Sequence, residues 1–447
     1  MTSRELALAV IRDVFPRGGR SRGAHEAFAY LAERSELDQR DRAFAAELAY
    51  GAIKARRYLD WLLAPFVGAR KKELPPTILE ILRLGAYQLS RMAVAEHAAV
   101  SETVGLAKKH GHRGTAGLVN AVLRKIAALD ESARLPRRED FASNDDWLGT
   151  SLSFPTWIVA GARDAFGDDM AEGILRGMNA PPQAAMRVNL LRITPEDAIE
   201  ALQAQAVTVR RSELVSEILL LTDGAPHAVV DDPELRWEPQ GEIAAVPVDL
   251  LAPQPGAHGV ELCSGRGNKT LEIVGRMQDR GKLEAIESDP RKVAEERERL
   301  ERLRVFSVVL REGDATDVAG ASDDADFALV DAPCSGLGIL GRQPEARWRK
   351  QPGDPPRLAK LQSALLDAAA KRVHDGGRLV YSVCTFDPRE THERVDAFLA
   401  SHGEFARGET PLRYERWRLP NGDLRVPPGI DGRDGFYIAV LERRALR

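Results

Sequence analysis

Cysteine is scarce in this chain, with three residues among 447. Three thiols cannot build a disulfide framework, and one would always stay unpaired. We therefore expect a reducing, cytoplasmic setting in which the thiols are free. Long hydrophobic runs are also missing, since no stretch approaches the ~18 apolar residues of a membrane span. The first residues lack the hydrophobic core of a signal peptide. The composition thus predicts a globular protein with no membrane partner.

Metal-binding motifs are missing as well. The sequence has no His-Glu-x-x-His, no Cys-x-x-Cys and no cluster of cysteine with histidine. We therefore expect no metal site.

The net charge of −4 conceals two parts of opposite sign. Residues 1–138 hold 24 Lys and Arg against 15 Asp and Glu, a balance of +9. The rest of the chain holds 39 against 52, a balance of −13. A basic segment of this kind suits a polyanion such as nucleic acid, although a solvated helical surface rich in Arg gives the same count.

The spacing of apolar residues predicts an all-α domain over residues 1–135. Residues such as Leu6 and Val10 recur at helical spacing, and no stretch alternates as a strand does. The polar stretch 130–146 predicts a linker. Residues 146–245 mix helix and strand signals, so we expect a small α/β module there.

From residue 246 to 447 the pattern changes to alternating strands and helices. This alternation predicts an α/β fold with a doubly wound, mostly parallel sheet, whose ligands bind at the carboxyl ends of the strands. The predicted strands are 259–263, 282–287, 305–310, 327–331 and 378–382, and the predicted helices between them include 290–303 and 358–373.

A turn with two glycines follows the first of these strands. Its small residues let backbone N–H groups approach a ligand at a helix N-terminus, although the pattern alone also fits an ordinary tight turn. Glu287 ends the second strand, where a carboxylate can bind both ribose hydroxyls. Asp314 follows the third strand and can contact an adenine. Together these groups predict a cofactor that contains adenosine. Its expected contacts are Cys263, Ser264, Gly265, Arg266, Gly267, Asn268, Lys269, Glu287, Asp314 and Asp331.

Two thiols lie at the ends of the fourth and fifth predicted strands. Cys334 lies in Asp-Ala-Pro-Cys-Ser-Gly, residues 331–336, and Cys384 lies in Tyr-Ser-Val-Cys-Thr, residues 381–385. Cysteine is also a common small core residue. However, Pro333 forces an extended backbone on the residue before it, which is typical of a loop at a site and not of a core strand. Two thiols at paired strand ends indicate covalent chemistry.

These segments resemble those of a known family. Residues 331–338, Asp-Ala-Pro-Cys-Ser-Gly-Leu-Gly, resemble the signature of RNA 5-methylcytosine methyltransferases, and residues 381–385 are similar to its second cysteine motif. Arg-Val-Asn at 187–189 resembles a motif of the family's RNA-binding module. The N-terminal 130 residues resemble the antitermination factor NusB, for example in Val-Asn-Ala-Val-Leu-Arg at 119–124. A NusB-like domain before such a catalytic part is the arrangement of the RsmB (Sun) family, which methylates cytosine in small-subunit (16S) ribosomal RNA.

The resemblance implies a Rossmann-like, class I methyltransferase domain that uses S-adenosyl-L-methionine and acts on RNA, with ribosomal RNA as the expected partner. It implies that Cys384 attacks C6 of cytosine, that Cys334 assists release of the adduct, and that Asp331 holds the base. It also implies that Arg187 and Asn189 contact RNA. We expect a monomer.

The cofactor loop departs from the family pattern. The usual Cys-Ala-Ala-Pro-Gly-Gly-Lys-Thr is here Cys-Ser-Gly-Arg-Gly-Asn-Lys-Thr, so Arg266 replaces proline and Asn268 replaces the second glycine. Glu287 stands where the family usually has Asp. Two other interpretations stay open, a transfer RNA cytosine methyltransferase and a non-catalytic RNA-binding factor of ribosome assembly.

Overall fold

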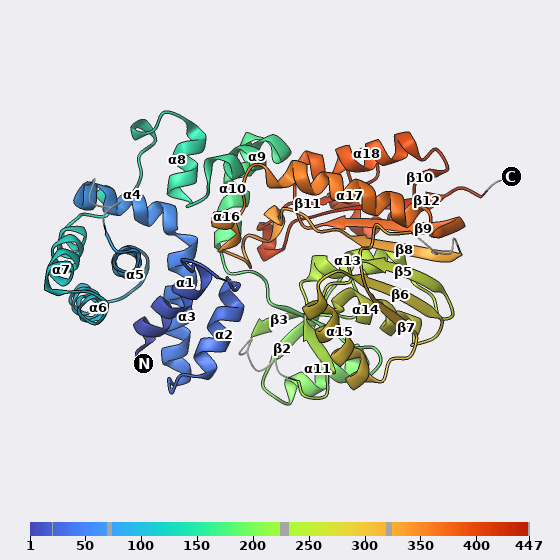
Figure 1. Ribbon diagram of the computed structural model, residues 1–447, viewed down its shortest axis with the longest axis horizontal. Coiled ribbons are helices and arrows are strands. Elements are labelled where there is room, and N and C mark those ends of the chain that lie inside the picture. Colours follow the sequence, from blue (N-terminus) through green and yellow to red (C-terminus); the bar gives the residue numbers. More distant parts are fainter. Residues whose placement is uncertain (20, 69–73, 224–231, 319–323, 446–447) are drawn as a thin grey trace. The chain divides into compact units, whose positions relative to one another are not determined.

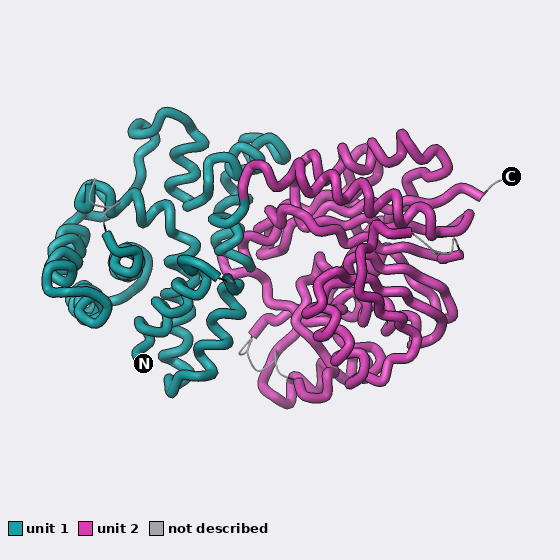
Figure 2. The backbone as a smooth tube through the Cα atoms, viewed as in Figure 1, with its two compact units in different colours: residues 1–179, 342–350 teal, residues 180–341, 351–447 magenta. Residues whose placement is uncertain are grey.

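The structure is a computed structural model that describes residues 1–19, 21–68, 74–223, 232–318 and 324–445. The chain forms two compact units (Figure 2). The first comprises residues 1–179 and 342–350, and the second comprises residues 180–341 and 351–447.

The first unit is helical, as the apolar spacing predicts (Figure 1). Thr2 caps the first helix through a capping box with Glu5, and Pro76 opens α5 at its first turn. Helix α5 contacts α1, α3, α4, α6 and α7 and is buried on most sides, so it forms the centre of the bundle. The helices are α1 (Ser3–Val14), α2 (Ala24–Glu33), α3 (Gln39–Lys54), α4 (Arg56–Val67), α5 (Pro76–Arg91), α6 (Glu96–His110) and α7 (Arg113–Ala127).

Three more helices of the first unit are α8 (Asn144–Ser151), α9 (Thr156–Phe166) and α10 (Asp168–Asn179). Arg57 of α4 fastens them to the bundle, because its guanidinium donates to the carbonyl oxygen of Phe154 and to Asp146 Oδ1, each at 2.8 Å. The α/β module expected at residues 146–245 is therefore divided, with α8, α9 and α10 in the first unit and its strands in the second.

A segment from far along the sequence, residues 342–350 with α16 (Ala346–Arg349), also belongs to the first unit. The fully buried Arg347 donates to the carbonyl oxygen of Ser153 at 3.2 Å and to Asn179 Oδ1 at 2.8 Å. Trp348 Nε1 donates to a carbonyl oxygen of α3 at 2.6 Å. This segment follows the Cys334 loop in sequence but is packed as part of the helical unit.

The second unit begins with a four-stranded antiparallel sheet of order β2-β3-β1-β4. Its strands are β1 (Ala185–Val188), β2 (Thr208–Arg211), β3 (Ile218–Asp223) and β4 (Trp237–Pro239). Helix α11 (Pro195–Gln203) shares a core with them through Leu202, Met186 and Leu219. Thr194 caps this helix by accepting from Asp197 N at 3.2 Å.

The main sheet of the second unit has eight strands in the described residues, in the order β10-β12-β9-β8-β5-β6-β7, with β11 paired to β12. Strands β5 to β9 run parallel, and β10, β11 and β12 pair antiparallel. The predicted α/β class is confirmed, although the third predicted strand was placed about three residues early. The bounds are β5 (His258–Leu262), β6 (Lys282–Glu287), β7 (Val308–Glu312), β8 (Ala325–Asp331), β9 (Val373–Val383), β10 (Phe405–Arg407), β11 (Leu424–Val426) and β12 (Phe436–Arg443).

Helices cover both faces of this sheet (Figure 1). Alternate residues of β8 point to opposite faces, since Phe327 and Leu329 join one core and Ala328 and Val330 join the other. The first core includes α13 (Glu242–Leu251) and α14 (Asn268–Met277), and the second includes α17 (Asp354–Ala370) and α18 (His392–Ser401). Helix α15 (Pro290–Leu303) matches its predicted bounds.

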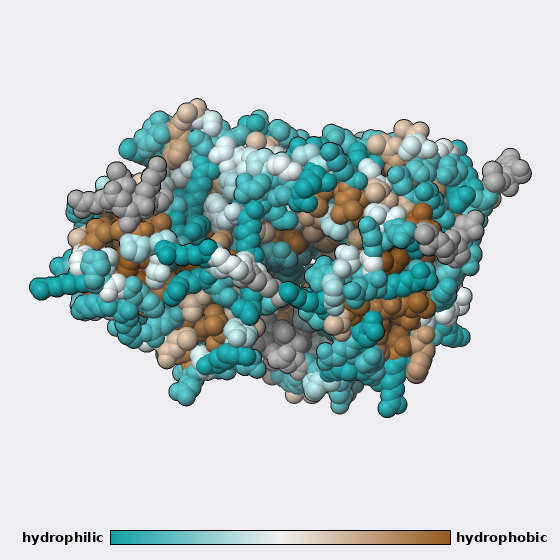
Figure 3. Space-filling model, in the orientation of Figure 1, coloured by the Kyte–Doolittle hydropathy of each residue, from teal (hydrophilic) through white to brown (hydrophobic). Residues whose placement is uncertain are grey.

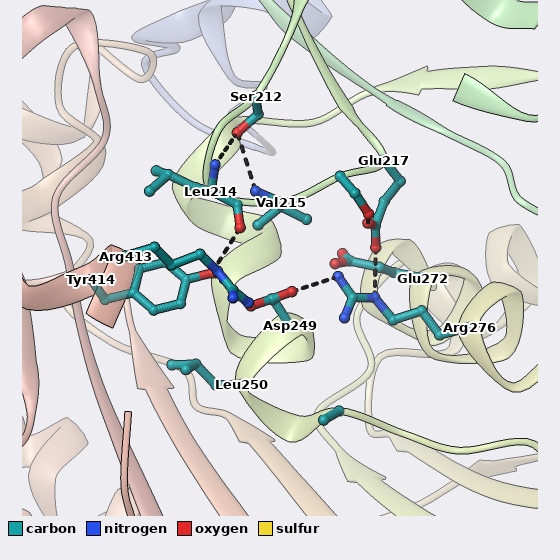
Figure 4. A network of polar contacts seen from close by, with 12 residues as sticks. Ser212, Leu214, Val215, Glu217, Asp249, Leu250, Glu272, Arg276, Arg413 and Tyr414 are labelled. Atoms are coloured by element: carbon teal, nitrogen blue, oxygen red, sulfur yellow. Dashed lines mark hydrogen bonds and ion pairs between the residues drawn. The ribbon is translucent and has the colours of Figure 1, made fainter. Parts of the chain in front are cut away.

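A polar network fastens the small sheet to the main domain (Figure 4). Arg276 of α14 donates to Glu217, just before β3, at 2.6 Å, and to Asp249 of α13 at 3.0 Å. Asp249 also accepts from the Tyr414 hydroxyl at 2.7 Å and from Arg413. The two sheets of the second unit are thus joined by ion pairs as well as by packing.

The surface is mainly hydrophilic on the face seen in Figure 3, where hydrophobic residues form separate patches. Among the described helices, none is both long and apolar enough to span a membrane.

Candidate active site

The strand ends of the main sheet gather the residues that the sequence singles out. Strand β5 has β6 on one side and β8 on the other, so the strand order reverses there. Doubly wound sheets bind ligands outside the carboxyl ends of strands at such a point. Cys263 follows β5, Glu287 ends β6 and Asp331 ends β8. Strand β9 pairs with β8 and leads directly to Cys384.

The two thiols lie side by side, with 3.3 Å between the Sγ atoms of Cys334 and Cys384. Both are free and partly buried. The hydrogen bond to Cys384, together with burial, raises the pKa of Cys334 well above its usual value. Cys334 is therefore held as a neutral thiol, which can donate its S–H to the sulfur of Cys384.

One buried carboxylate, Glu390, ties the two cysteine loops together. Its Oε1 accepts from Ser335 N at 2.9 Å and from Gln362 Nε2 at 3.0 Å, and its Oε2 accepts from the Ser335 hydroxyl. The hydroxyls of Ser335 and Thr385 lie 2.8 Å apart. Because Ser335 and Thr385 each follow one of the thiols, this network fixes the distance between the sulfurs.

Neither Glu390 nor Gln362 was found from the sequence. Gln362 lies in α17 and Glu390 in a 3-10 turn, Pro388–Glu390, and neither belongs to a motif. The only signal in the sequence was the position of Glu390, an acid six residues after Cys384.

A glycine contact also holds the thiol loops together. Gly338 N donates to the carbonyl oxygen of Cys384 at 2.9 Å, and Gly435 N donates to that of Gly338 at 2.8 Å. A Cβ at position 338 would lie 2.1 Å from the oxygen of Gly435. Only glycine allows this approach.

Asp331 is oriented from two sides. Its Oδ2 accepts from Lys269 Nζ at 2.6 Å, and its Oδ1 accepts from the Ser382 hydroxyl at 3.1 Å. Burial opposes the charge of Lys269, but attraction to Asp331 outweighs it and raises the lysine pKa. The Lys269 side chain therefore stays charged and positions the carboxylate.

The turn after β5 has a left-handed backbone conformation at several positions. Cys263, Gly265 and Gly267 have φ values of 64°, 67° and 79°, so the chain reverses through left-handed positions. Glu287 braces the turn, because its Oε2 accepts from Gly265 N at 2.9 Å and its Oε1 accepts from Ser288 N at 2.9 Å. A carboxylate oxygen has two lone pairs, so Oε2 keeps one for a ligand hydroxyl.

Helix α15 supports the same turn where its sequence departs from the family pattern. Glu295 forms an ion pair with Arg266 at 2.8 Å. Arg299 donates to the carbonyl oxygen of Arg266 and, at 2.8 Å, to Asn268 Oδ1. Glu296 accepts from the Ser264 hydroxyl at 2.6 Å. One face of α15 thus fixes a turn that lacks the usual proline.

Two carboxyls beneath the turn share a proton. The Thr270 hydroxyl oxygen lies 2.7 Å from Glu261 Oε2 and 2.7 Å from Glu296 Oε1. A hydroxyl has one hydrogen to donate, and an ionised carboxylate can only accept. One carboxyl must therefore be protonated, in agreement with the raised pKa that burial gives to both Glu261 and Glu296.

The remaining predicted site residues take different positions. Asp314 follows β7 and is exposed, and its carboxylate accepts from Thr316 N and Oγ1. Arg187 is 1% exposed and donates to Glu238 and Gln240. Asn189 is fully buried, so neither it nor Arg187 offers a surface to RNA here. Within the described ranges, no group of three or more His, Cys, Asp or Glu could hold a metal ion.

Comparison with known proteins decides the family. A family model described as 16S rRNA methyltransferase RsmB/F matches residues 248–442, the NusB family matches 1–128, and the ferredoxin-like domain of RsmF/B-like methyltransferases matches 154–228. Ribosomal RNA small subunit methyltransferase B of Thermus thermophilus is 34% identical over 443 residues, which cover 99% of this chain and 98% of the relative. The chain belongs to the RsmB family. The predicted family is therefore confirmed.

A second relative supports the family, and two solved structures share the fold. A probable ribosomal RNA small subunit methyltransferase B of Bacillus subtilis is 30% identical over 421 residues, 92% of each chain. The crystal structure of PH0851 shares the fold with a TM-score of 0.83 at 23% identity and covers 99% of both chains. The crystal structure of NSun6 from Pyrococcus horikoshii with SFG has a TM-score of 0.57 at 21% identity and covers 65% of this chain and 98% of its own.

Proposed function

We propose that this RsmB-family protein is an S-adenosyl-L-methionine-dependent RNA cytosine-C5 methyltransferase that acts on 16S ribosomal RNA through a covalent bond from Cys384 to C6. The observation that carries the proposal is the pair of thiols, 3.3 Å apart at the ends of adjacent parallel strands, next to the carboxylate of Asp331. C5 of cytosine is a poor nucleophile, and covalent catalysis by a thiol is the chemistry that overcomes this.

The residues at the carboxyl ends of β5, β6 and β7 suit the cofactor. Glu287 keeps an acceptor for a ribose hydroxyl, the turn at 263–269 presents backbone N–H groups near the start of α14, and Asp314 is exposed where an adenine would lie. S-adenosyl-L-methionine supplies a methyl group bound to a positive sulfur, which is an electrophile.

Cys384 is our nucleophile. Its thiolate adds to C6 of the base, which forms an S–C6 bond and shifts an electron pair to C5. C5 is then enamine-like and can take up a methyl group. The sulfur of Cys334 lies 3.3 Å from that of Cys384, so the neutral Cys334 can donate its S–H to the attacking sulfur.

Cys334 has the second role. After methylation, loss of the C5 proton restores the C5–C6 double bond and expels the sulfur of Cys384. For this step Cys334 first gives its own S–H proton to solvent, and its thiolate is then a strong base for the C5 proton, because its environment raises its pKa. The second thiol thus serves release and not attack.

Asp331 orients the cytosine. Its carboxylate can accept from the exocyclic amine, and it can accept from N3–H once N3 has taken up a proton from solvent as C6 is attacked. Lys269 keeps the carboxylate in place through the 2.6 Å ion pair. The base must leave any stack to reach the thiol, so single-stranded loops are the expected targets.

We assign a different function to each of the three predicted regions. Residues 1–135 would bind RNA through their excess positive charge, residues 146–245 would support that binding, and residues 246–447 would carry out methyl transfer. The predicted contact of Arg187 and Asn189 with RNA is not part of this proposal, because both side chains are buried. Arg187 instead shares Glu238 with Arg299, which holds the cofactor turn.

Bisulfite mapping of small-subunit ribosomal RNA tests the function. Cells that lack the gene should lose protection at one or more cytosines, the wild-type gene should restore it, and the Cys384→Ala gene should not. Equal protection in all three strains would reject the proposed function, and restoration by Cys384→Ala would reject the nucleophile.

A further inference from the structure

The first unit contains a cavity of about 380 Å³ that no part of the catalytic account uses. It lies among α3, α4, α5, α10 and the end of α8. Its charged lining residues are Lys54, Arg91 and Arg176, and no Asp or Glu lines it. The cavity therefore has a positive lining.

Lys54 and Arg91 have no ion-pair partner among the described residues. The ammonium of Lys54 donates only to the carbonyl oxygen of Asn179, at 3.3 Å. The Arg91 guanidinium lies over the Tyr58 ring, 4.2 Å from its centroid, at the exposed rim. Arg176, in contrast, is already paired with Glu172 at 2.6 Å. Two cations of the cavity are thus available to an anion.

Lys54 is in an unfavourable place for a cation. Burial, together with the nearby Arg347, lowers the pKa of Lys54 to about 8, although the carboxylate of Glu47 acts against this shift. The Ser151 hydroxyl, also at the cavity, is buried and has no hydrogen-bond partner among the described residues. A buried hydroxyl without a hydrogen-bond partner and an ammonium with a lowered pKa are typical of a site that binds an oxyanion.

We propose that this cavity binds a phosphate group of the RNA backbone, with the half-buried Lys54 and the exposed Arg91 as its cations. The proposal rests on the proposed function, since it takes RNA as the substrate. An open rim suits a polymer, because a phosphate can enter while the rest of the strand stays outside.

The cavity also borders the segment that follows the Cys334 loop. Asn179, which accepts from Lys54 through its carbonyl oxygen, accepts from Arg347 of segment 342–350 through its Oδ1 at 2.8 Å. Ser153 lines the cavity and accepts from Arg347 as well. A phosphate here therefore lies beside the residues that anchor that segment.

Equilibrium binding of a small-subunit ribosomal RNA fragment at several salt concentrations tests the site. Lys54→Gln should weaken binding by about tenfold at low salt and reduce the salt slope by about 0.7–0.9, which corresponds to one lost phosphate contact. Arg91→Gln should act in the same direction. Lys125→Gln, which removes the same charge from an exposed position of α7, is the matched control and should stay near wild type.

The readouts separate the possible failures. Thermal melting should show Lys54→Gln to be as stable as wild type or more stable, because it loses a buried charge, so weaker binding would not reflect unfolding. If Lys54→Gln and Arg91→Gln bind RNA with the wild-type affinity and slope, or if wild type binds no RNA, the phosphate site is rejected. Methyl transfer by the wild-type protein is measured in parallel. If it is observed while the variants bind RNA normally, the phosphate site is rejected and the proposed function is kept.

Discussion

At the scale of single residues, the site depends on two thiols in direct contact. Cys334 has a raised pKa and stays neutral, so it can donate its S–H to the sulfur of Cys384. Sequence spacing predicted the two thiols and their meeting at one sheet edge. It could not predict the raised pKa of Cys334, because that shift arises from a 3.3 Å contact and from buried partners such as Glu390.

Removal of the second thiol should trap the reaction. In Cys334→Ala, attack and methylation can proceed but release should slow by about 10²-fold or more, as for loss of a general base. A covalent protein–RNA complex should then appear on denaturing gels in the presence of S-adenosyl-L-methionine. The Cys334→Ala, Cys384→Ala double variant should give none. A complex formed by the double variant would contradict the assigned roles.

A buried acid outside the thiol site should make stability depend on pH. Burial raises the pKa of Glu272 from 4.5 to about 8. Between these values the unfolded chain has lost the proton and the folded chain keeps it, so the free energy of unfolding falls as pH rises toward 8. Glu272 accepts from Gln240 at 2.6 Å, and a glutamine can accept there too.

Glu272→Gln should therefore raise the Tm of the second unit by a few °C at pH 8 and by much less at pH 5. In a domain of this size, each kcal/mol added to the free energy of unfolding raises the Tm by about 2–4 °C. Differential scanning calorimetry at the two pH values measures this. Glu298→Gln, at an exposed position of α15, should show no such trend. A Tm difference that is equal at both pH values would disprove the buried proton.

At the scale of elements, helix α15 fixes the shape of the cofactor turn, which the proline of the usual family sequence would otherwise restrict. The turn at 263–269 lacks the family proline, and side chains of α15 bind it at several points. The sequence predicted the bounds of this helix, because its proline start and apolar spacing are local signals. It could not predict the bracing, because that depends on which face of α15 meets the turn.

Loss of this bracing should weaken cofactor binding. Glu296→Ala and Arg299→Ala should each raise the Kd for S-adenosyl-L-methionine by about tenfold, because the turn loses hydrogen bonds worth on the order of 1–2 kcal/mol. Isothermal titration calorimetry measures the change, and Glu298→Ala on the same helix is the control. Wild-type affinity in both test variants would show that the turn is stable without α15.

At the scale of the whole molecule, the chain has a basic helical part and an acidic α/β part, as its charge count indicates. The helical bundle and the mostly parallel sheet followed from the spacing of apolar residues in the sequence. The return of segment 342–350 to the helical unit did not, because its anchor is a buried arginine, Arg347. Long-range packing of charged residues leaves no periodic signal.

The central claim is that a methyl group replaces the hydrogen on C5 of a cytosine. The direct measurement uses small-subunit ribosomal RNA that carries tritium at C5 of its cytosines and counts tritium released into water against methyl groups transferred. The account predicts one tritium released for each methyl group with wild-type protein and no release with Cys384→Ala. Methyl transfer without tritium release would place the methyl group elsewhere and contradict the account.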